Sequence, residues 1–244
     1  MGVQWHSYPN PKTAAAECAA FTVARLEGVL SSKDYATCAL SGGSTPRLLF
    51  EQLASRKFPW NQVHFFWVDE RMVPPDDDAS NFRLASEAFF EPAKVPQRNL
   101  HRIHGEVAPE TAAREYVQEI RRFFGLEIGE MPRFDLLHRG MGPDGHTASL
   151  FPGEALGGER ERIAAAVYAA SVKQWRVTLL PGVLLAAAET VLLVTGADKA
   201  QAVRSTFREP YNPLRYPAQL GAQGRNPATW FLDRAAARLL EAEE

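Results

Sequence analysis

Residues 134–151 read FDLLHRGMGPDGHTASLF. The apolar run at 134–137 predicts a buried strand, and the glycines in the residues that follow predict a tight loop. Folds of the α/β class place reactive groups on such loops, at the carboxyl ends of their strands. Asp144 and His146 lie two residues apart on this loop, and a histidine held there can exchange a proton near neutral pH. The segment therefore predicts an α/β fold and favours an enzyme.

The spacing of Gly140, Gly142 and Gly145 also matches the G-x-G-x-x-G pattern of dinucleotide-binding turns. Such a turn opens directly into a helix whose N-terminus receives the pyrophosphate, whereas here Pro143 falls inside the turn and a Pro-Gly pair follows at 152–153. An acidic residue is also expected about 20 residues further on, and residues 163–170 contain no carboxylate. The context therefore disfavours an NAD-binding turn.

Apolar runs elsewhere predict the rest of a sheet. They lie at 35–40, 63–68, 163–169, 190–195 and 229–232, and amphipathic stretches at 12–30, 46–55, 81–89, 109–124, 198–207 and 233–241 predict helices. Continuous apolar strands that alternate with helices are typical of a Rossmann-like, mostly parallel sheet with helices on both faces. No repeat or low-complexity linker divides the chain, so we expect residues 1–244 to form a single α/β domain.

The composition argues against nucleic acid and anionic membranes as partners of this chain. The chain has 244 residues and a formal net charge of −2 at pH 7, without a basic block that would attract nucleic acid or an anionic membrane. Residues 1–6 lack the features of a secretory signal, and no apolar run approaches the roughly 20 residues that cross a bilayer. Cys18 and Cys38 are expected to be buried thiols. We expect a cytoplasmic protein that acts on a small molecule, with no obligate protein partner.

The residues after the predicted strand at 35–40 form a candidate phosphate site. They are Ser41, Gly42, Gly43, Ser44 and Thr45. The glycines allow backbone N–H groups to converge on an anion, and the dipole of the following helix favours a phosphate. Pro46 suits the first helical position and Thr45 could cap the helix, so an ordinary capped turn is the alternative. No Lys-Ser or Lys-Thr follows the glycines, which excludes a nucleoside-triphosphate loop.

Charged residues follow the strand predicted at 63–68. Asp69 and Arg71 come directly after it, and a guanidinium there could grip a phosphate or a carboxylate with two hydrogen bonds. A surface ion-pair cluster is the alternative. Asn81 opens a predicted helix, where capping is its simplest role. The aspartates at 76–78 lack the spacing of a calcium loop.

Lys199 lies in the first turn of the helix predicted at 198–207, where the helix dipole disfavours a cation. A bound anion would remove this conflict, and Asp198 alone could also offset it. His101 and His104 are three residues apart in an extended stretch, so their rings should point to opposite faces and not share a metal. Without a Cys/His cluster, no metal site is predicted.

Taken together, these segments resemble the 6-phosphogluconolactonase family of the glucosamine-6-phosphate isomerase/6-phosphogluconolactonase superfamily. The matching segments are residues 41–46, 68–71 with 80–81, 140–151, 196–199, and 176–179, which resembles the family's Arg-Ile-Thr segment. The chain departs from the pattern at His138 and Arg139, which interrupt a usually apolar run, and at 180–182. The resemblance implies a sugar-phosphate isomerase-like fold. It also implies hydrolysis of 6-phosphogluconolactone in the pentose phosphate pathway.

The resemblance suggests roles for the site residues. His146 would be the general base that activates water, and Asp144 would either orient it or shape the turn. Residues 41–45, Arg71 and Lys199 would anchor the phosphate, with Asp69 and Asn81 also contacting substrate. Arg176 would contact the substrate or the developing oxyanion. No metal or organic cofactor is expected.

Two other functions remain open. A glucosamine-6-phosphate deaminase/isomerase shares the fold, but its Asp-Gly-His element is followed closely by an Asn-Glu-Pro carboxylate, whereas this chain has no acid between His146 and Glu154. A non-catalytic sugar-phosphate sensor would have no need of His146. Both comparisons favour the lactonase.

Overall fold

The computed structural model describes residues 4–222 and 228–241. Within these ranges the main sheet has seven strands, all parallel, in the order β1-β10-β9-β6-β2-β3-β5. The strands are β1 (Gln4–Tyr8), β10 (Thr229–Asp233), β9 (Glu189–Val194), β6 (Leu136–Arg139), β2 (Ala36–Leu40), β3 (Val63–Trp67) and β5 (Leu100–His101). Residues 1–3, 223–227 and 242–244, which the prediction of one domain also covers, lie outside the described residues.

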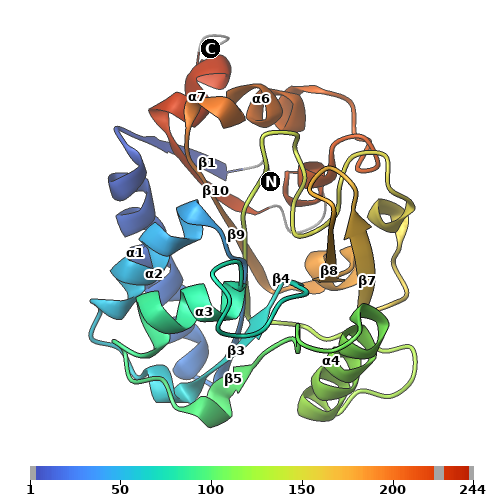
Figure 1. The fold of residues 1–244 in the computed structure, drawn as a ribbon. Helices are drawn as coiled ribbons and strands as arrows, with labels where there is room; N and C mark the ends of the chain where they lie inside the picture. The colour runs from blue at the N-terminus through green and yellow to red at the C-terminus, as the bar shows by residue number, and fades with distance from the viewer. Residues whose placement is uncertain (1–3, 223–227, 242–244) are drawn as a thin grey trace.

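Helices cover both faces of this sheet, as alternate residues of β9 and β10 show. Val191, Leu193 and Phe231 belong to one buried cluster with residues of α1 (Pro11–Leu30) and α2 (Ser44–Ala54). Leu192 and Trp230 belong to a second cluster with residues of α6 (Ala200–Arg208) and α7 (Arg234–Glu241). Figure 1 shows α1 and α2 beside one another at the left and α6 with α7 at the top of the view. The predicted fold class is confirmed.

A second, antiparallel sheet was not predicted. In the part of the chain that the structure describes it has three strands, in the order β4 (Asp69–Arg71), β8 (Gln174–Leu179) and β7 (Ala164–Ala169). Val68 joins the two sheets, because its N–H donates to the Leu40 carbonyl and its carbonyl accepts from Leu179 N–H, both at 2.8 Å. The helix α4 (Pro109–Phe124) packs against β7 and β8 (Figure 1). The short helix α5 (Pro181–Ala186) follows β8.

The predicted helix at 81–89 is divided. It begins as α3 (Asn81–Ala85) and continues as a π-helical segment, Ser86–Phe90. The predicted helix at 198–207 likewise begins with a 3₁₀ turn, Ala197–Lys199, before α6. None of the helices within 4–222 and 228–241 is long and apolar enough to cross a membrane.

Candidate active site

The loops that leave three adjacent strands, β2, β6 and β9, border a cavity of about 200 Å³. The second sheet closes one side of it, since Asp69 and Arg71 of β4 and Arg176 of β8 also line the cavity. This is the position expected for a ligand in an open α/β sheet, outside the carboxyl ends of the strands.

The structure brings the predicted site residues together in this cavity. Those lining it are Ser41, Gly42, Gly43, Ser44, Thr45, Asp69, Arg71, Asn81, His146, Arg176 and Lys199. Asp144 is not among the lining residues but contacts His146.

The imidazole of His146 is held by Asp144. Its Nδ1 lies 2.6 Å from Oδ1 of Asp144, which also accepts the His146 backbone N–H at 3.1 Å. Burial raises the pKa of Asp144, but the hydrogen bonds and charge of His146 outweigh burial and leave that pKa below its ordinary value. An ionised carboxylate only accepts hydrogen bonds, so Nδ1 carries a proton and neutral His146 offers Nε2 as its basic nitrogen.

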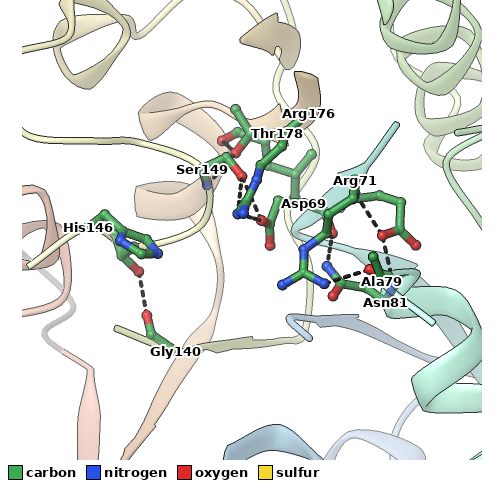
Figure 2. A network of polar contacts seen from close by, with 12 residues as sticks. Asp69, Arg71, Ala79, Asn81, Gly140, His146, Ser149, Arg176 and Thr178 are labelled. Carbon is green, nitrogen blue, oxygen red and sulfur yellow. Dashed lines mark hydrogen bonds and ion pairs between the residues drawn. The ribbon is translucent and has the colours of Figure 1, made fainter. Parts of the chain in front are cut away.

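The loop that carries His146 is closed by its own backbone. Gly142 N–H donates to the His146 carbonyl at 2.9 Å, and the Thr147 hydroxyl donates to the Gly140 carbonyl at 2.9 Å (Figure 2). A Cβ at Gly142 would overlap the imidazole of His146. The Phe151 ring lies with its centroid 4.6 Å from that of His146. Gly142 and Phe151 therefore confine the imidazole of His146 to one position in the loop.

The turn after β2 differs in one respect from the prediction. Gly43, with φ of 115°, is the N-cap of α2, which begins at Ser44, so the predicted capping role of Thr45 is wrong. The Thr45 hydroxyl instead lies 3.0 Å from that of Thr195, which ties the β2 loop to the β9 loop. No side chain caps α2, so the N–H groups of its first turn are available to an anion.

Three cationic side chains line the same cavity. Arg71 donates to the Ala79 carbonyl at 2.6 Å, and Lys199 lies 3.0 Å from the Asp198 carboxylate. The third, Arg176, lies 3.8 Å from the Asp69 carboxylate, and both side chains are largely buried (Figure 2). Lys199, at the N-cap of α6, is thus paired with Asp198, one of the two partners that the sequence leaves open for it.

Several known proteins are similar to this chain along most of its length. A family model described as glucosamine-6-phosphate isomerases/6-phosphogluconolactonase matches residues 9–230. The chain belongs to this family. It is 37% identical over 213 residues to a 6-phosphogluconolactonase of Synechocystis, covering 87% of this chain and 88% of that protein. It is 34% identical over 210 residues to the Thermotoga maritima 6-phosphogluconolactonase, covering 86% of this chain and 90% of that protein.

Solved structures of family members have the same fold. The Thermotoga maritima 6-phosphogluconolactonase structure superposes with a TM-score of 0.81 at 31% identity, over 94% of this chain and 99% of that chain. A monomeric glucosamine-6-phosphate deaminase superposes with a TM-score of 0.79 at 19% identity, over 97% of this chain and 99% of that chain. The fold is therefore common to both branches of the family.

Asn81 has a different local role from the one predicted. Ser80 is the N-cap of α3, since its hydroxyl accepts the Arg83 N–H at 3.2 Å. This leaves the Asn81 side chain in the cavity, where Nδ2 donates to the Asp69 carbonyl at 2.8 Å. Its Oδ1 is buried and has no hydrogen-bond partner among the described residues.

Two residues that support the site were missed. The buried Ser149 donates its hydroxyl to Asp69 Oδ2 at 2.7 Å and its N–H to the Thr178 hydroxyl at 3.2 Å. Glu70, 2% exposed, accepts four hydrogen bonds from the loop 71–82. Burial raises the pKa of Glu70 to about 6, although backbone N–H groups lower it. The sequence shows a carboxylate beside Asp69 and Arg71 but not whether it points into the protein.

The remaining histidines lie outside this cavity. His64 Nδ1 lies 2.9 Å from Nε2 of His101 on the neighbouring strand. His101 also contacts Glu119, whereas His104 contacts Glu115. The described residues contain no group of three or more His, Cys, Asp or Glu side chains arranged to hold a metal ion.

Proposed function

We propose that the chain hydrolyses 6-phospho-D-glucono-1,5-lactone to 6-phospho-D-gluconate, with His146 as the general base. One observation carries the proposal. The imidazole of His146, which Asp144 holds, lines the same small cavity as the uncapped N-terminus of α2 and the side chains of Arg71, Arg176 and Lys199. A base and an anion site so close together suit a substrate that bears a phosphate and a reactive carbonyl. The names of the relatives support the same reaction.

The phosphate would bind where positive charge and N–H donors converge. The first turn of α2 and residues 41–45 supply N–H and hydroxyl donors, and Arg71 and Lys199 supply charge. The carboxylate of Asp69 would repel a phosphate, so it and the free Oδ1 of Asn81 better suit the sugar hydroxyls. Anchoring the phosphate holds the lactone carbonyl near His146 and lowers the entropic part of the barrier.

In the reaction, Nε2 of neutral His146 takes a proton from a water molecule as the water oxygen bonds to C1 of the lactone. Arg176 would stabilise the negative charge that develops on the carbonyl oxygen. The bond between C1 and the ring oxygen then breaks, and the imidazolium returns the proton to that oxygen. Ionised Asp144 stabilises the imidazolium between the two steps. This scheme uses neither a metal nor an organic cofactor, so prior treatment with a chelator should leave the rate unchanged.

A deaminase/isomerase is the alternative within the family, because it shares the fold. The first acid after His146 in the sequence is Glu154, and it is not among the residues that line the cavity. The observed site therefore offers that chemistry no carboxylate from this segment. A non-catalytic sensor would bind the phosphate but needs neither His146 nor its Asp144 partner.

The proposal is tested with purified protein at neutral pH. Lactone hydrolysis is followed by a coupled assay against the spontaneous rate in buffer, with glucosamine 6-phosphate assayed in parallel. Lactone hydrolysis well above the buffer rate, without deamination, is the expected result. Deamination without lactonase activity would favour the alternative enzyme, and phosphosugar binding without turnover would favour the sensor.

We further propose that residues 1–244 form a single domain. We also propose that the protein is located in the cytoplasm. Support for one domain comes from a buried cluster that contains residues of both sheets, such as Phe65 and Val177. Support for a reducing compartment comes from Cys18 and Cys38, which are buried and unpaired.

A further inference from the structure

The buried carboxylate of Glu70 closes a loop that borders the cavity. Its Oε1 accepts the N–H of Arg71 at 2.8 Å and the N–H of Asn81 at 2.8 Å. Its Oε2 accepts the N–H of Phe82 at 2.8 Å and the hydroxyl of Ser80 at 3.2 Å. One side chain therefore holds both ends of the segment between β4 and α3.

This carboxylate does not itself line the cavity, but two residues that it holds do. Arg71 stands at the start of the loop and Asn81 at its end, and both line the cavity. The Arg71 guanidinium donates to the carbonyl of Ala79, within the same loop (Figure 2). The position of that guanidinium therefore depends on the loop conformation, which Glu70 constrains at both ends.

A carboxylate suits this position better than its amide. Its oxygens only accept hydrogen bonds, and all three backbone contacts come from N–H donors. A glutamine would place an NH₂ group against at least one of these N–H groups. The substitution preserves the size of the side chain and removes part of the connection between the loop ends.

We propose that Glu70 is a positioning residue for phosphate recognition: it fixes the 71–82 loop so that the Arg71 guanidinium faces the phosphate, whereas the Asn81 side chain is held separately by the Asp69 carbonyl. The inference rests on the proposed function, which supplies the phosphorylated substrate. It assigns Glu70 an effect on binding of the phosphate and none on the chemical step at His146.

The test compares Glu70→Gln with Glu87→Gln, which removes an exposed carboxylate that pairs with Arg83 on the helix after the loop. For Glu70→Gln, KM for the phosphorylated lactone should rise about tenfold while kcat changes by less than about threefold. Any activity on unphosphorylated gluconolactone should stay within about twofold of wild type. The control should match wild type on both substrates. Equal losses on both lactones, or a fall confined to kcat, would overturn the proposal.

Binding of inorganic phosphate and of 6-phosphogluconate, measured by calorimetry, separates this proposal from the proposed function. Glu70→Gln should weaken both by about tenfold, whatever the catalytic activity. A wild-type chain that hydrolyses no lactone contradicts the proposed function, and the phosphate titration still decides the role of Glu70. Unchanged affinity in Glu70→Gln, or no binding of either probe by wild type, would overturn the positioning role.

A milder variant serves if Glu70→Gln does not fold. Ser80→Ala removes one of the four donors to Glu70 and the cap of α3. It should raise KM for the phosphorylated lactone by about threefold and leave the unphosphorylated lactone unaffected. Hydrogen exchange should accelerate in residues 71–82 and at the Arg83 N–H that Ser80 caps. An unchanged ratio of the two kcat/KM values would contradict the proposal.

Discussion

Oδ1 of Asp144 lies 2.6 Å from Nδ1 of His146 and 3.1 Å from the backbone nitrogen of the same residue. One carboxylate oxygen thus contacts both the ring and the backbone of the histidine. The side-chain contact sets the tautomer, and the backbone contact shapes the turn. The two roles that the sequence left open for Asp144 are therefore compatible.

Asp144→Asn should lower kcat on the phosphorylated lactone about ten- to a hundredfold with little change in KM. An amide no longer stabilises the imidazolium or fixes its tautomer, and the same change beside the histidine base of a serine protease costs at least this much in kcat. Steady-state kinetics measures the effect, with Asp78→Asn, a change at an exposed carboxylate that pairs with Arg83 outside the cavity, as the control. A kcat equal to wild type would restrict Asp144 to the turn.

Arg71→Ala and Lys199→Ala should each lower kcat/KM on the phosphorylated lactone by roughly ten- to a hundredfold, because each removes a contact worth about 1.5–3 kcal/mol. Activity on unphosphorylated gluconolactone should be nearly unaffected. Arg122→Ala, at an exposed ion pair on α4, is the control. Equal losses on both lactones, or a large fall in melting temperature, would indicate structural ion pairs instead of phosphate anchors.

Gly142→Ala tests the fit of the loop around the base. The new Cβ would overlap the imidazole of His146 and displace it, and a misplacement of about 1 Å can cost a hundredfold in rate. We expect kcat to fall at least about tenfold while 6-phosphogluconate still binds. Gly28→Ala, where a Cβ meets nothing within 4 Å, is the matched control. A fully active Gly142→Ala enzyme would show that the imidazole need not occupy this place.

His138 should make the protein sensitive to acid. Burial lowers the pKa of this imidazole to about 4 in the folded state, below the value of about 6.5 in the unfolded chain. Between these values the unfolded state binds a proton that the folded state excludes. The free energy of unfolding should therefore decrease as the pH is lowered from 6.5 to 4, by up to about 1.4 kcal/mol per pH unit.

Denaturant unfolding at several pH values measures that dependence. A folded His138→Leu variant should show a smaller pH slope than wild type in this window. A slope that is the same in His138→Leu and in wild type would contradict the assignment.

Much of the candidate site could be predicted because parallel strands end at one edge of a sheet. The sequence predicts a polar loop after each of the strands β2, β6 and β9, and residues of all three loops line one cavity in the structure. Arg176 was placed by resemblance alone. Its register opposite Arg71 depends on the antiparallel pairing of β4 and β8, which local sequence does not reveal.

Other features depend on contacts distant in the sequence. The place of Thr45 before Pro46 predicts a helix cap, but its hydroxyl lies against that of Thr195, 150 residues away. The pairing of His64 with His101 likewise depends on β3 lying beside β5, a strand of two residues that carries no periodicity. Such contacts follow from strand order and register, which a single sequence does not specify.

The rate of lactone hydrolysis by His146→Ala tests the central claim most directly. The variant should lose about 10²- to 10⁴-fold in kcat, measured above the spontaneous rate in buffer, because the general base is gone. Its affinity for 6-phosphogluconate should stay within about threefold of wild type, since the proposed phosphate anchors are untouched. A correctly folded His146→Ala protein with near wild-type turnover would contradict the account.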